Sequence, residues 1–341
     1  MKKIACLFAA LMLTAVIKAE TPDEKENREG RRMAVVELST IYMRIKPDYE
    51  SALETQELMG TVVEITGEEG YWREIVSPQP YRAWATEKGL VEMNPKELEA
   101  YEAAPKVIYT GLYGHIYMEP SYRSATICDL VGGDLMRYVG KKGKWTEVML
   151  PSGRKGFVPA KELKLHEGFI SIAQGEGSAE SISPETTEAV IAQAEKLLGV
   201  PYLWGGMSAK GVDCSGLVRI SHIMNGILLP RNASQQINCG DRVPMETDIR
   251  FWDEANRNGG NEEELRKEML KRIGNLERGD LVFFGTPAAQ PGGKPRVTHV
   301  GIYLGNRKII HSSHMVRINS LIPGDEDYYE NSWRLLGAVR L

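Results

Sequence analysis

The chain has 341 residues, of which 42% are hydrophobic and 26% charged, and its net charge at pH 7 is −4. This length allows two or three domains, and the balance of apolar and charged residues is that of a globular protein. The slightly negative net charge argues against nucleic-acid binding, which usually requires a basic face.

The N-terminus is typical of an export signal followed by a linker. A pair of lysines precedes an apolar run over residues 4–17, which is shorter than the roughly 20 residues needed to span a bilayer. Ala19 supplies a small residue for cleavage, and the charged residues 20–32 are typical of a solvated linker. We expect residues 1–19 to be a signal peptide, and the mature protein to be periplasmic or extracellular without a membrane span. A buried N-terminal helix is the alternative.

Cleavage of that signal would leave three cysteines, Cys128, Cys214 and Cys239. An odd number of cysteines outside the cytoplasm leaves at least one free thiol. Such a thiol is either a reactive group or a small buried hydrophobic residue, and composition alone favours the second interpretation.

The first half of the chain contains a repeat, because residues 47–90 match the sequence 73 positions further on without a gap. The matched pairs include Pro47 with Pro120, Gly60 with Gly133, Gly70 with Gly143 and Trp72 with Trp145. Residues 61–66 and 72–76 are rich in strand-forming residues, with glycine and proline at the turns. The pattern predicts two small β-barrels.

The stretch PDYESALETQELMGTVVEITGEEGYWREIV, followed by Trp84, resembles bacterial SH3-like domains. The resemblance covers residues 33–98 and, more loosely, 105–165. Residues 166–186 are rich in Gly, Ser and Glu and are expected to form a linker. A further domain would then occupy residues 187–341.

The second half begins with a predicted helix over residues 187–198, with Gly199 as its C-cap. A glycine-rich loop follows, and a second helical pattern starts just after Cys214. The N-terminus of a helix lowers the pKa of a thiol through its dipole and free N–H groups. Cys214 is therefore a candidate nucleophile with a lowered pKa.

A base for Cys214 is sought among six histidines, and His299 and His311 flank a predicted hairpin. Strand alternation places both on one face only if the numbers of paired residues sum to an even value, as those of Gly301 and His311 do, which requires an odd loop such as Gly305–Asn306–Arg307 with a bulge. Direct pairing of Leu304 with Arg307 would place them on opposite faces. On the pattern alone, both could equally be ordinary strand residues.

Papain-like logic then assigns the roles: Cys214 attacks a carbonyl, His299 takes and returns the proton, and His311 orients His299. This half of the chain resembles the NlpC cell-wall peptidases, which are papain-like enzymes that cut peptidoglycan stem peptides. The motifs that carry the resemblance are PYLWGG, DCSGLV, LPRNASQQ, GDLVFF, THVGIYLG and IIHSS. It implies Cys214, His299 and His311 as catalytic residues, and Tyr202 as an oxyanion-stabilising residue. A packed aromatic is the alternative for Tyr202.

The expected fold class is α+β, with two small SH3-like β-barrels followed by a papain-like α+β cysteine peptidase domain. That layout is similar to relatives that cut between γ-D-glutamate and a diamino acid and require a free N-terminal L-alanine. The resemblance implies Tyr81, from the first barrel, and Ser215 as substrate-binding residues, although Tyr81 could equally be a packed turn aromatic.

The sequence departs from these relatives where they carry acidic groups for the substrate amine. Ala52 and Asn232 align with those acids, and Ala233 replaces a serine. A buried ammonium without a carboxylate is costly. Either Asp213 supplies the charge or the free-amine requirement is relaxed, so Asp213 and Asn232 are both candidate substrate-binding residues.

Residues 244–278 form a second departure, a charged insertion in which Leu265, Met269 and Ile273 have helical spacing. The main interpretation is that the charged side chains of this segment form a solvated face. The more specific one is that the segment is a flap beside the cleft. The Pro–Gly loop at 285–296 is another possible rim.

The expected substrate is a peptidoglycan stem peptide or muropeptide, hydrolysed by a cysteine endopeptidase. The alternatives are a papain-like amidase or acyltransferase, and a non-catalytic wall-binding protein. No metal or cofactor is expected, because the histidines lack a spacing such as HExxH. The sequence does not indicate an oligomeric state.

Overall fold

The computed structural model describes residues 30–78, 81–172, 182–245, 262–286, 288, 293 and 295–341. The expected signal peptide and nearly all of the linker after it lie outside these residues. Among the residues described, no helix is both long enough and apolar enough to cross a membrane.

The first β domain is an antiparallel sheet of seven short strands in the order β3-β2-β6-β5-β4-β1-β7. Alternation buries one face of each strand, and Val36, Ile41, Met43 and Ile75 form much of its core. The outer strands β3 and β7 are not hydrogen-bonded to each other, so the sheet is SH3-like without being a closed barrel. The strands are β1 (Arg32–Val36), β2 (Thr40–Arg44), β3 (Leu53–Leu58), β4 (Val62–Glu69), β5 (Trp72–Val76), β6 (Arg82–Thr86) and β7 (Leu90–Met93).

The second β domain repeats this topology strand for strand, in the order β10-β9-β13-β12-β11-β8-β14. The glycines matched in the repeat have matching conformations, with φ of 87° at Gly60 and 96° at Gly133, which only glycine adopts readily. The duplication inferred from the sequence is therefore visible in the fold. The strands are β8 (Lys106–Tyr109), β9 (Tyr113–Tyr117), β10 (Thr126–Val131), β11 (Leu135–Lys142), β12 (Trp145–Met149), β13 (Lys155–Pro159) and β14 (Leu163–His166).

A helix that the sequence analysis missed, α2 (Pro95–Ala103), joins the two β domains. The side chain of Asn94 accepts hydrogen bonds at its N-terminus, and Glu97 bonds back to the Asn94 N–H, which is a complete capping box. Leu98 and Tyr101 pack against Val35, so α2 continues the core of the first domain.

The expected linker is partly structured where it is described. Short strand β15 (Ile170–Ser171) pairs in parallel with β18 (Ile227–Leu228) of the last domain. Helix α3 (Pro184–Lys196) begins before the expected boundary, with Ser183 as its N-cap. Gly199 follows with φ of 83°, in agreement with a helix that ends just before it.

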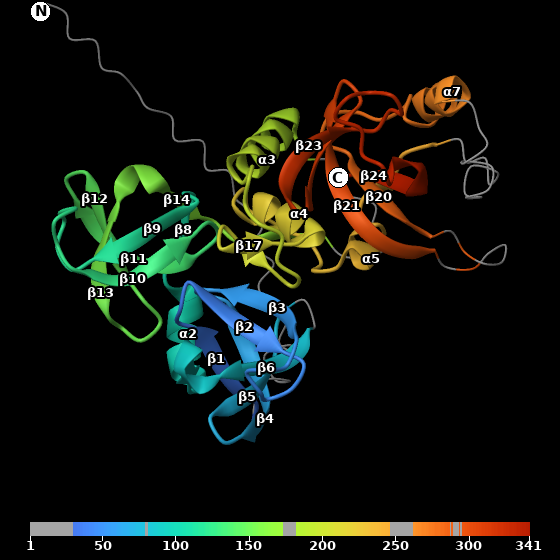
Figure 1. The fold of residues 1–341 in the computed structure, drawn as a ribbon. Coiled ribbons are helices and arrows are strands. Elements are labelled where there is room, and N and C mark those ends of the chain that lie inside the picture. The colour runs from blue at the N-terminus through green and yellow to red at the C-terminus, as the bar shows by residue number, and fades with distance from the viewer. Residues whose placement is uncertain are drawn as a thin grey trace, which may run out of the picture. The chain divides into compact units, whose positions relative to one another are not determined.

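The last domain is α+β, with a six-stranded sheet in the order β19-β24-β20-β21-β22-β23 (Figure 1). Helix α4 (Cys214–Ile223) packs against β21, β22 and α3. The sheet strands are β19 (Asp241–Arg242), β20 (Leu281–Thr286), β21 (Arg296–Gly305), β22 (Lys308–Ser313), β23 (Met315–Ser320) and β24 (Leu335–Arg340). The remaining elements are β16 (Met207–Ser208), β17 (Gly211–Val212) and the short helix α5 (Ala233–Gln236).

The described part of the insertion is helix α7 (Glu262–Arg272) and the turn after it, which confirms helix in this region. Met269 and Ile273 are buried in a cluster with Phe284 and Tyr329, on one face of the sheet. This part of the insertion therefore supports the sheet. Residues 246–261, and half of the Pro–Gly loop at 285–296, lie outside the described residues.

Candidate active site

Cys214 is the first residue of α4, as the sequence pattern predicts. Asp213 is the N-cap, and its Oδ1 accepts a hydrogen bond of 2.7 Å from the Gly216 N–H. Its Oδ2 accepts another, of 3.0 Å, from the N–H of Gly205. A Cβ at Gly216 would collide with the carbonyl oxygen of Gly206, so glycine at this position lets the helix begin against the glycine-rich loop.

The Cys214 thiol is buried, and burial has the largest effect on its pKa. Burial raises the pKa of Cys214 to about 12, and the nearby Asp213 adds to the rise. The N–H groups of Val300 and Ser215 lower it, but by less. The expectation of a lowered thiol pKa was therefore wrong, because desolvation outweighs the helix terminus. Cys214 keeps its proton until a base removes it.

In the hairpin that carries His299 and His311, the numbers of the residues paired nearest to them sum to an even value, which places both histidines on the same face of the sheet. Ile302 pairs with Ile310 and Tyr303 with Ile309, and the register shifts before Gly305 pairs with Lys308. The extra residue is a bulge at Leu304, and Asn306 and Arg307 form the turn with positive φ. The closing pair differs by one residue from the expected loop, but the parity is confirmed.

His299 and His311 are in direct contact, with His299 Nε2 2.7 Å from His311 Nδ1. On its other side, His311 Nε2 lies 2.9 Å from Asn319 Oδ1, and the Asn319 amide donates to the carbonyl oxygen of Asp327 at 2.8 Å. A backbone carbonyl only accepts, so Asn319 Oδ1 must accept from His311 Nε2–H. His311 Nδ1 then accepts from His299 Nε2–H. The remaining lone pair, on His299 Nδ1, is the basic one.

Both histidines are held neutral. Burial lowers the pKa of His299 to about 3, with further lowering from His311 and Arg317. Burial also lowers the pKa of His311 to about 4, although the hydrogen bond to Asn319 opposes this. The Tyr329 ring packs against both imidazoles, with centroids 5.6 and 4.6 Å away. Both imidazoles are therefore neutral at pH 7, and the lone pair on His299 Nδ1 can accept a proton.

Two substitutions of Asn319 should distinguish its role in orienting His311 from the effect of a charge beside His311. Asn319→Ala should lower kcat by up to about tenfold, since one net hydrogen bond is worth about 1 kcal/mol. Asn319→Asp also loses the hydrogen bond to the Asp327 carbonyl oxygen. It places a carboxylate beside His311, which raises the pKa of the two histidines. The acid limb of kcat, which lies below about pH 5 in the unaltered enzyme because both pKa values are lowered, should move to higher pH. A pH–rate profile checks this; an unmoved limb contradicts it, and exposed Asn238→Asp is the control.

Cys214 opens into a cleft of about 410 Å³. Six of the residues singled out from the sequence line it: Tyr81, Tyr202, Asp213, Cys214, Ser215 and Asn232. Its other lining residues are Glu54, Trp204, Arg231, Ala233, Ser234, Arg296, Val297 and Thr298. His299 and His311 are not among the lining residues; His299 follows Thr298 on β21. Burial and the nearby Cys214 raise the pKa of Tyr202 to about 12, so its hydroxyl stays a donor.

The cleft contains an acidic residue, Glu54, close in sequence to Ala52. Glu54, on β3, accepts a 3.0 Å hydrogen bond from the Tyr81 hydroxyl, which also lies 3.5 Å from Asn232 Oδ1. Glu54 lies two residues after Ala52, the position that was aligned with an acid. Glu54, Tyr81 and Asn232 together form one polar cluster in the cleft.

Asp213 is already occupied by a cation from the same domain. Arg231 donates to both of its carboxylate oxygens, at 3.0 and 2.6 Å, and also to Ser215 Oγ at 2.9 Å. The same guanidinium donates to Thr55 Oγ1 of β3 at 2.8 Å. The carboxylate of Asp213 is thus neutralised, and its role is to hold α4 and β3 together rather than to offer a free charge.

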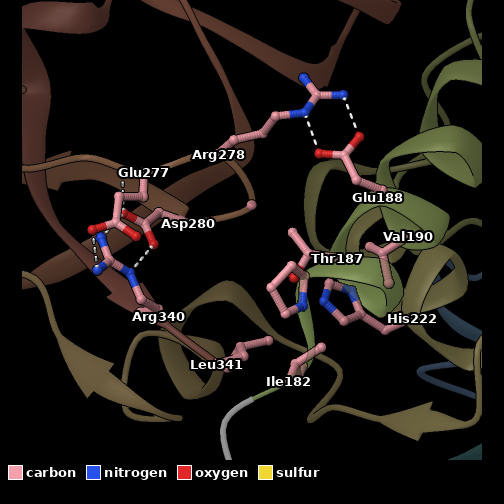
Figure 2. Close-up of a pocket in the computed structure, with 12 residues that line it drawn as sticks. Ile182, Thr187, Glu188, Val190, His222, Glu277, Arg278, Asp280, Arg340 and Leu341 are labelled. Carbon is pink, nitrogen blue, oxygen red and sulfur yellow. Dashed lines mark hydrogen bonds and ion pairs between the residues drawn. The ribbon is translucent and has the colours of Figure 1, made fainter.

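A second cavity, of about 460 Å³, lies beside the far end of α4 from Cys214 (Figure 2). Its charged residues are paired with each other: Arg278 binds Glu188, and Arg340 binds Asp280 and Glu277. His222 at its wall has its Nδ1 2.7 Å from the Val218 carbonyl, and burial lowers its pKa to about 4. These groups do not form a nucleophile–base pair. Within the described ranges, no cluster of three or more His, Cys, Asp or Glu could hold a metal ion.

The sequence analysis missed Glu54, Arg231, Asn319 and Tyr329 as site residues. Arg231 stood inside a quoted motif without a role. Asn319 could have been found by alternation, because β22 pairs with β23 and His311 faces Arg317, two residues from Asn319. Tyr329 lies in an irregular segment, where periodicity carries no signal.

Three comparisons with known proteins bear on this site. Residues 199–335 match the model of the NlpC/P60 family. The chain is 27% identical to a γ-D-glutamyl-L-lysine dipeptidyl-peptidase of Bacillus cereus, over 80% of this chain and 70% of that protein. It is 26% identical to the Bacillus subtilis protein of the same name, over 85% and 81%. A crystal structure of an NlpC/P60 family protein from Bacillus cereus matches with a TM-score of 0.66 at 20% identity, over 90% of this chain and 99% of that one, which establishes the fold.

Proposed function

The C-terminal part of this chain is an NlpC/P60 domain, and we propose that the enzyme hydrolyses the bond between γ-D-glutamate and a diamino acid in peptidoglycan stem peptides. The observation that carries the proposal is the relay from His299 through His311 to Asn319, on the strand beside Cys214. It is joined by a cleft that carries an acidic residue from the first β domain.

The geometry supports a two-step acyl transfer. Cys214 Sγ attacks the γ-carbonyl carbon as its proton passes to His299 Nδ1, and the Tyr202 hydroxyl donates to the developing oxyanion. His299 returns the proton to the leaving amine, which leaves a γ-glutamyl thioester on Cys214. Water then attacks the thioester with His299 as base, releasing a carboxylic acid and the thiol. His311 orients His299 throughout.

Glu54 is proposed to bind the free N-terminal amine of the substrate, in place of the acids that the sequence lacks at Ala52 and Asn232. Its carboxylate lies in the cleft, and among the residues that the structure describes its one side-chain hydrogen bond comes from the Tyr81 hydroxyl, a neutral donor. Asp213 is less suited, because Arg231 already neutralises it. Burial raises the pKa of Tyr81, which keeps its hydroxyl available to hold Glu54 in place.

Replacing Glu54 by glutamine should show the effect of its negative charge alone, since glutamine keeps the shape of the side chain and an acceptor for the Tyr81 hydroxyl. A charge-assisted hydrogen bond is worth about 1.5–3 kcal/mol, so kcat/KM for a free-amine tripeptide should fall about tenfold to a hundredfold. An N-acetylated tripeptide should be cleaved equally slowly by both proteins. Exposed Glu50→Gln is the matched control. Equal cleavage of free and acetylated peptides by the unaltered enzyme would contradict amine recognition.

The direct test is incubation of L-Ala-γ-D-Glu-L-Lys with the purified protein and identification of the fragments by mass spectrometry. The proposal expects L-Ala-γ-D-Glu as the free acid, together with lysine. A transferred acyl group instead of a free acid would indicate an acyltransferase, and binding without cleavage would indicate a wall-binding protein. Cleavage at another bond would overturn the proposed specificity.

The substrate is derived from peptidoglycan, and the enzyme acts at the cell envelope or outside the cell. Within that range, we propose that residues 1–19 direct export and that stem peptides or muropeptides are bound. The contribution of the first β domain to the cleft favours small fragments over intact wall.

A further inference from the structure

Arg296 stands out in the cleft because its charge is uncompensated. It is exposed at the start of β21 and lines the same cleft as Cys214. The other arginine there, Arg231, is buried and bound to Asp213. Among the residues that the structure describes, the Arg296 guanidinium has no hydrogen-bond or ion-pair partner. An unpaired guanidinium in a substrate cleft is suited to a carboxylate, which it can bind through two parallel hydrogen bonds.

A bulge directs Arg296 to the same face of the sheet as His299. Along β20, Phe284 pairs with His299, Gly285 with Val297 and Thr286 with Arg296. Thr298 is the extra residue, so alternation is interrupted once between 297 and 299. Without the bulge, residues three apart would lie on opposite faces; with it, the positions of Arg296 and His299 face the same way.

The position of His299 indicates which part of the substrate is nearby. His299 must protonate the leaving nitrogen, so the leaving residue lies beside His299. The N-terminal amine of the substrate binds a group whose charge is opposite to that of Arg296. This group is the Glu54 carboxylate, which acts together with Tyr81 and Asn232. The cleft thus has an acidic residue for an ammonium and a basic residue on the strand that serves the leaving group.

From this arrangement we propose that Arg296 binds a carboxylate of the leaving diamino acid and so sets the preference for that residue. The inference rests on the proposed function. Two carboxylates have the required chemistry: the free α-carboxylate of a C-terminal residue, and the second carboxylate of a diamino dicarboxylic acid such as diaminopimelate. Lysine as its C-terminal amide has neither.

The test compares kcat/KM of the unaltered enzyme and Arg296→Gln on four peptides. Three are L-Ala-γ-D-Glu followed by lysine amide, by lysine free acid, or by diaminopimelate with an amidated α-carboxyl group. The fourth is the lysine free acid with the D-glutamate α-carboxyl group amidated. We expect Arg296→Gln to reduce kcat/KM about tenfold to a hundredfold where the leaving residue has a carboxylate, and less than about threefold for lysine amide. The second and third peptides show which carboxylate is bound.

Arg296→Lys should recover part of the loss, because it keeps the charge but not the bidentate geometry. Arg278→Gln, an arginine outside the cleft, should behave as the unaltered enzyme does. An equal loss on all peptides, or no loss on any, overturns the proposal for Arg296. So does a loss that disappears when the D-glutamate carboxyl group is amidated. Failure of the unaltered enzyme to cleave any peptide would instead overturn the proposed function.

Discussion

Replacement of Cys214 by alanine should reduce kcat by about ten-thousandfold or more, since it removes the sulfur that forms the thioester. The fold should persist, because the change removes one sulfur atom at the head of α4 while the Asp213 cap remains. Binding of the stem peptide should also survive, because Glu54, Tyr81 and Arg296 are untouched. The two measurements are steady-state hydrolysis and calorimetric binding of the same tripeptide.

Cys239 provides a matched control for that experiment. It is also a free, buried thiol, but its Sγ lies near the carbonyl oxygens of Ile172 and Gln235. Cys239→Ala should keep kcat within about twofold and lose only a little stability. Comparable losses of activity in the two variants would mean that the Cys214 effect is structural, and hydrolysis that survives Cys214→Ala would remove the mechanism.

Replacement of Arg231 by methionine should lower the free energy of unfolding by about 3–5 kcal/mol, because it leaves the buried Asp213 carboxylate without a counter-ion. The variant also loses the hydrogen bond from Arg231 to Thr55, which links the last domain to the first β domain. Both changes should loosen the base of the cleft, so activity should fall together with stability. Urea unfolding followed by tryptophan fluorescence measures the free energy.

Arg278→Met is the control for the buried pair. Arg278 binds Glu188 at 2.6 Å, but both side chains are exposed, at 40% and 58%. Exposed pairs contribute about 0–1 kcal/mol, so this variant should unfold almost as the unaltered protein does. Similar small losses in both variants would show that Asp213 finds another partner when Arg231 is removed.

The catalytic core could be predicted from the sequence because its signals are local. A cysteine at the start of a helical pattern and two histidines twelve residues apart in a hairpin depend on periodicity and turn chemistry. The register parity of the hairpin followed from the requirement that the histidines share a face, although the loop itself has two residues instead of the expected three. The bulge that satisfies it, at Leu304 instead of within the loop, lay one residue from the expected position.

The residues that complete the site could not be predicted in the same way, since they depend on contacts between distant parts of the chain. Glu54 and Tyr81 meet across strands of the first β domain, and Tyr81 reaches Asn232 only after that domain packs against the last one. Arg231 gained its role from Asp213 and Thr55 together. The acidity of Cys214 depends on how deeply its sulfur is buried, which a helix start does not reveal. Sequence periodicity reports one element at a time, whereas these properties arise between elements.

The insertion shows the same limit from another side. Its mixed charges suggested a solvated surface, and helical spacing at Met269 and Ile273 was the only sign of burial. In the structure, these two side chains pack in a cluster that includes Tyr329, the ring against which both catalytic histidines lie. Helix α7, none of whose described residues lines the cleft, thus supports the residues that position the base.

The central claim is that Cys214 forms a covalent bond with the N-terminal dipeptide of the substrate. It can be measured with L-Ala-γ-D-Glu that carries a chloromethyl ketone in place of the scissile amide, followed by proteolysis and mass spectrometry. We predict that the dipeptide mass appears on the peptide containing Cys214, that labelling parallels the loss of activity, and that Cys128 and Cys239 stay unmodified. Label on either of those cysteines instead, or continued hydrolysis by fully labelled enzyme, would contradict the account.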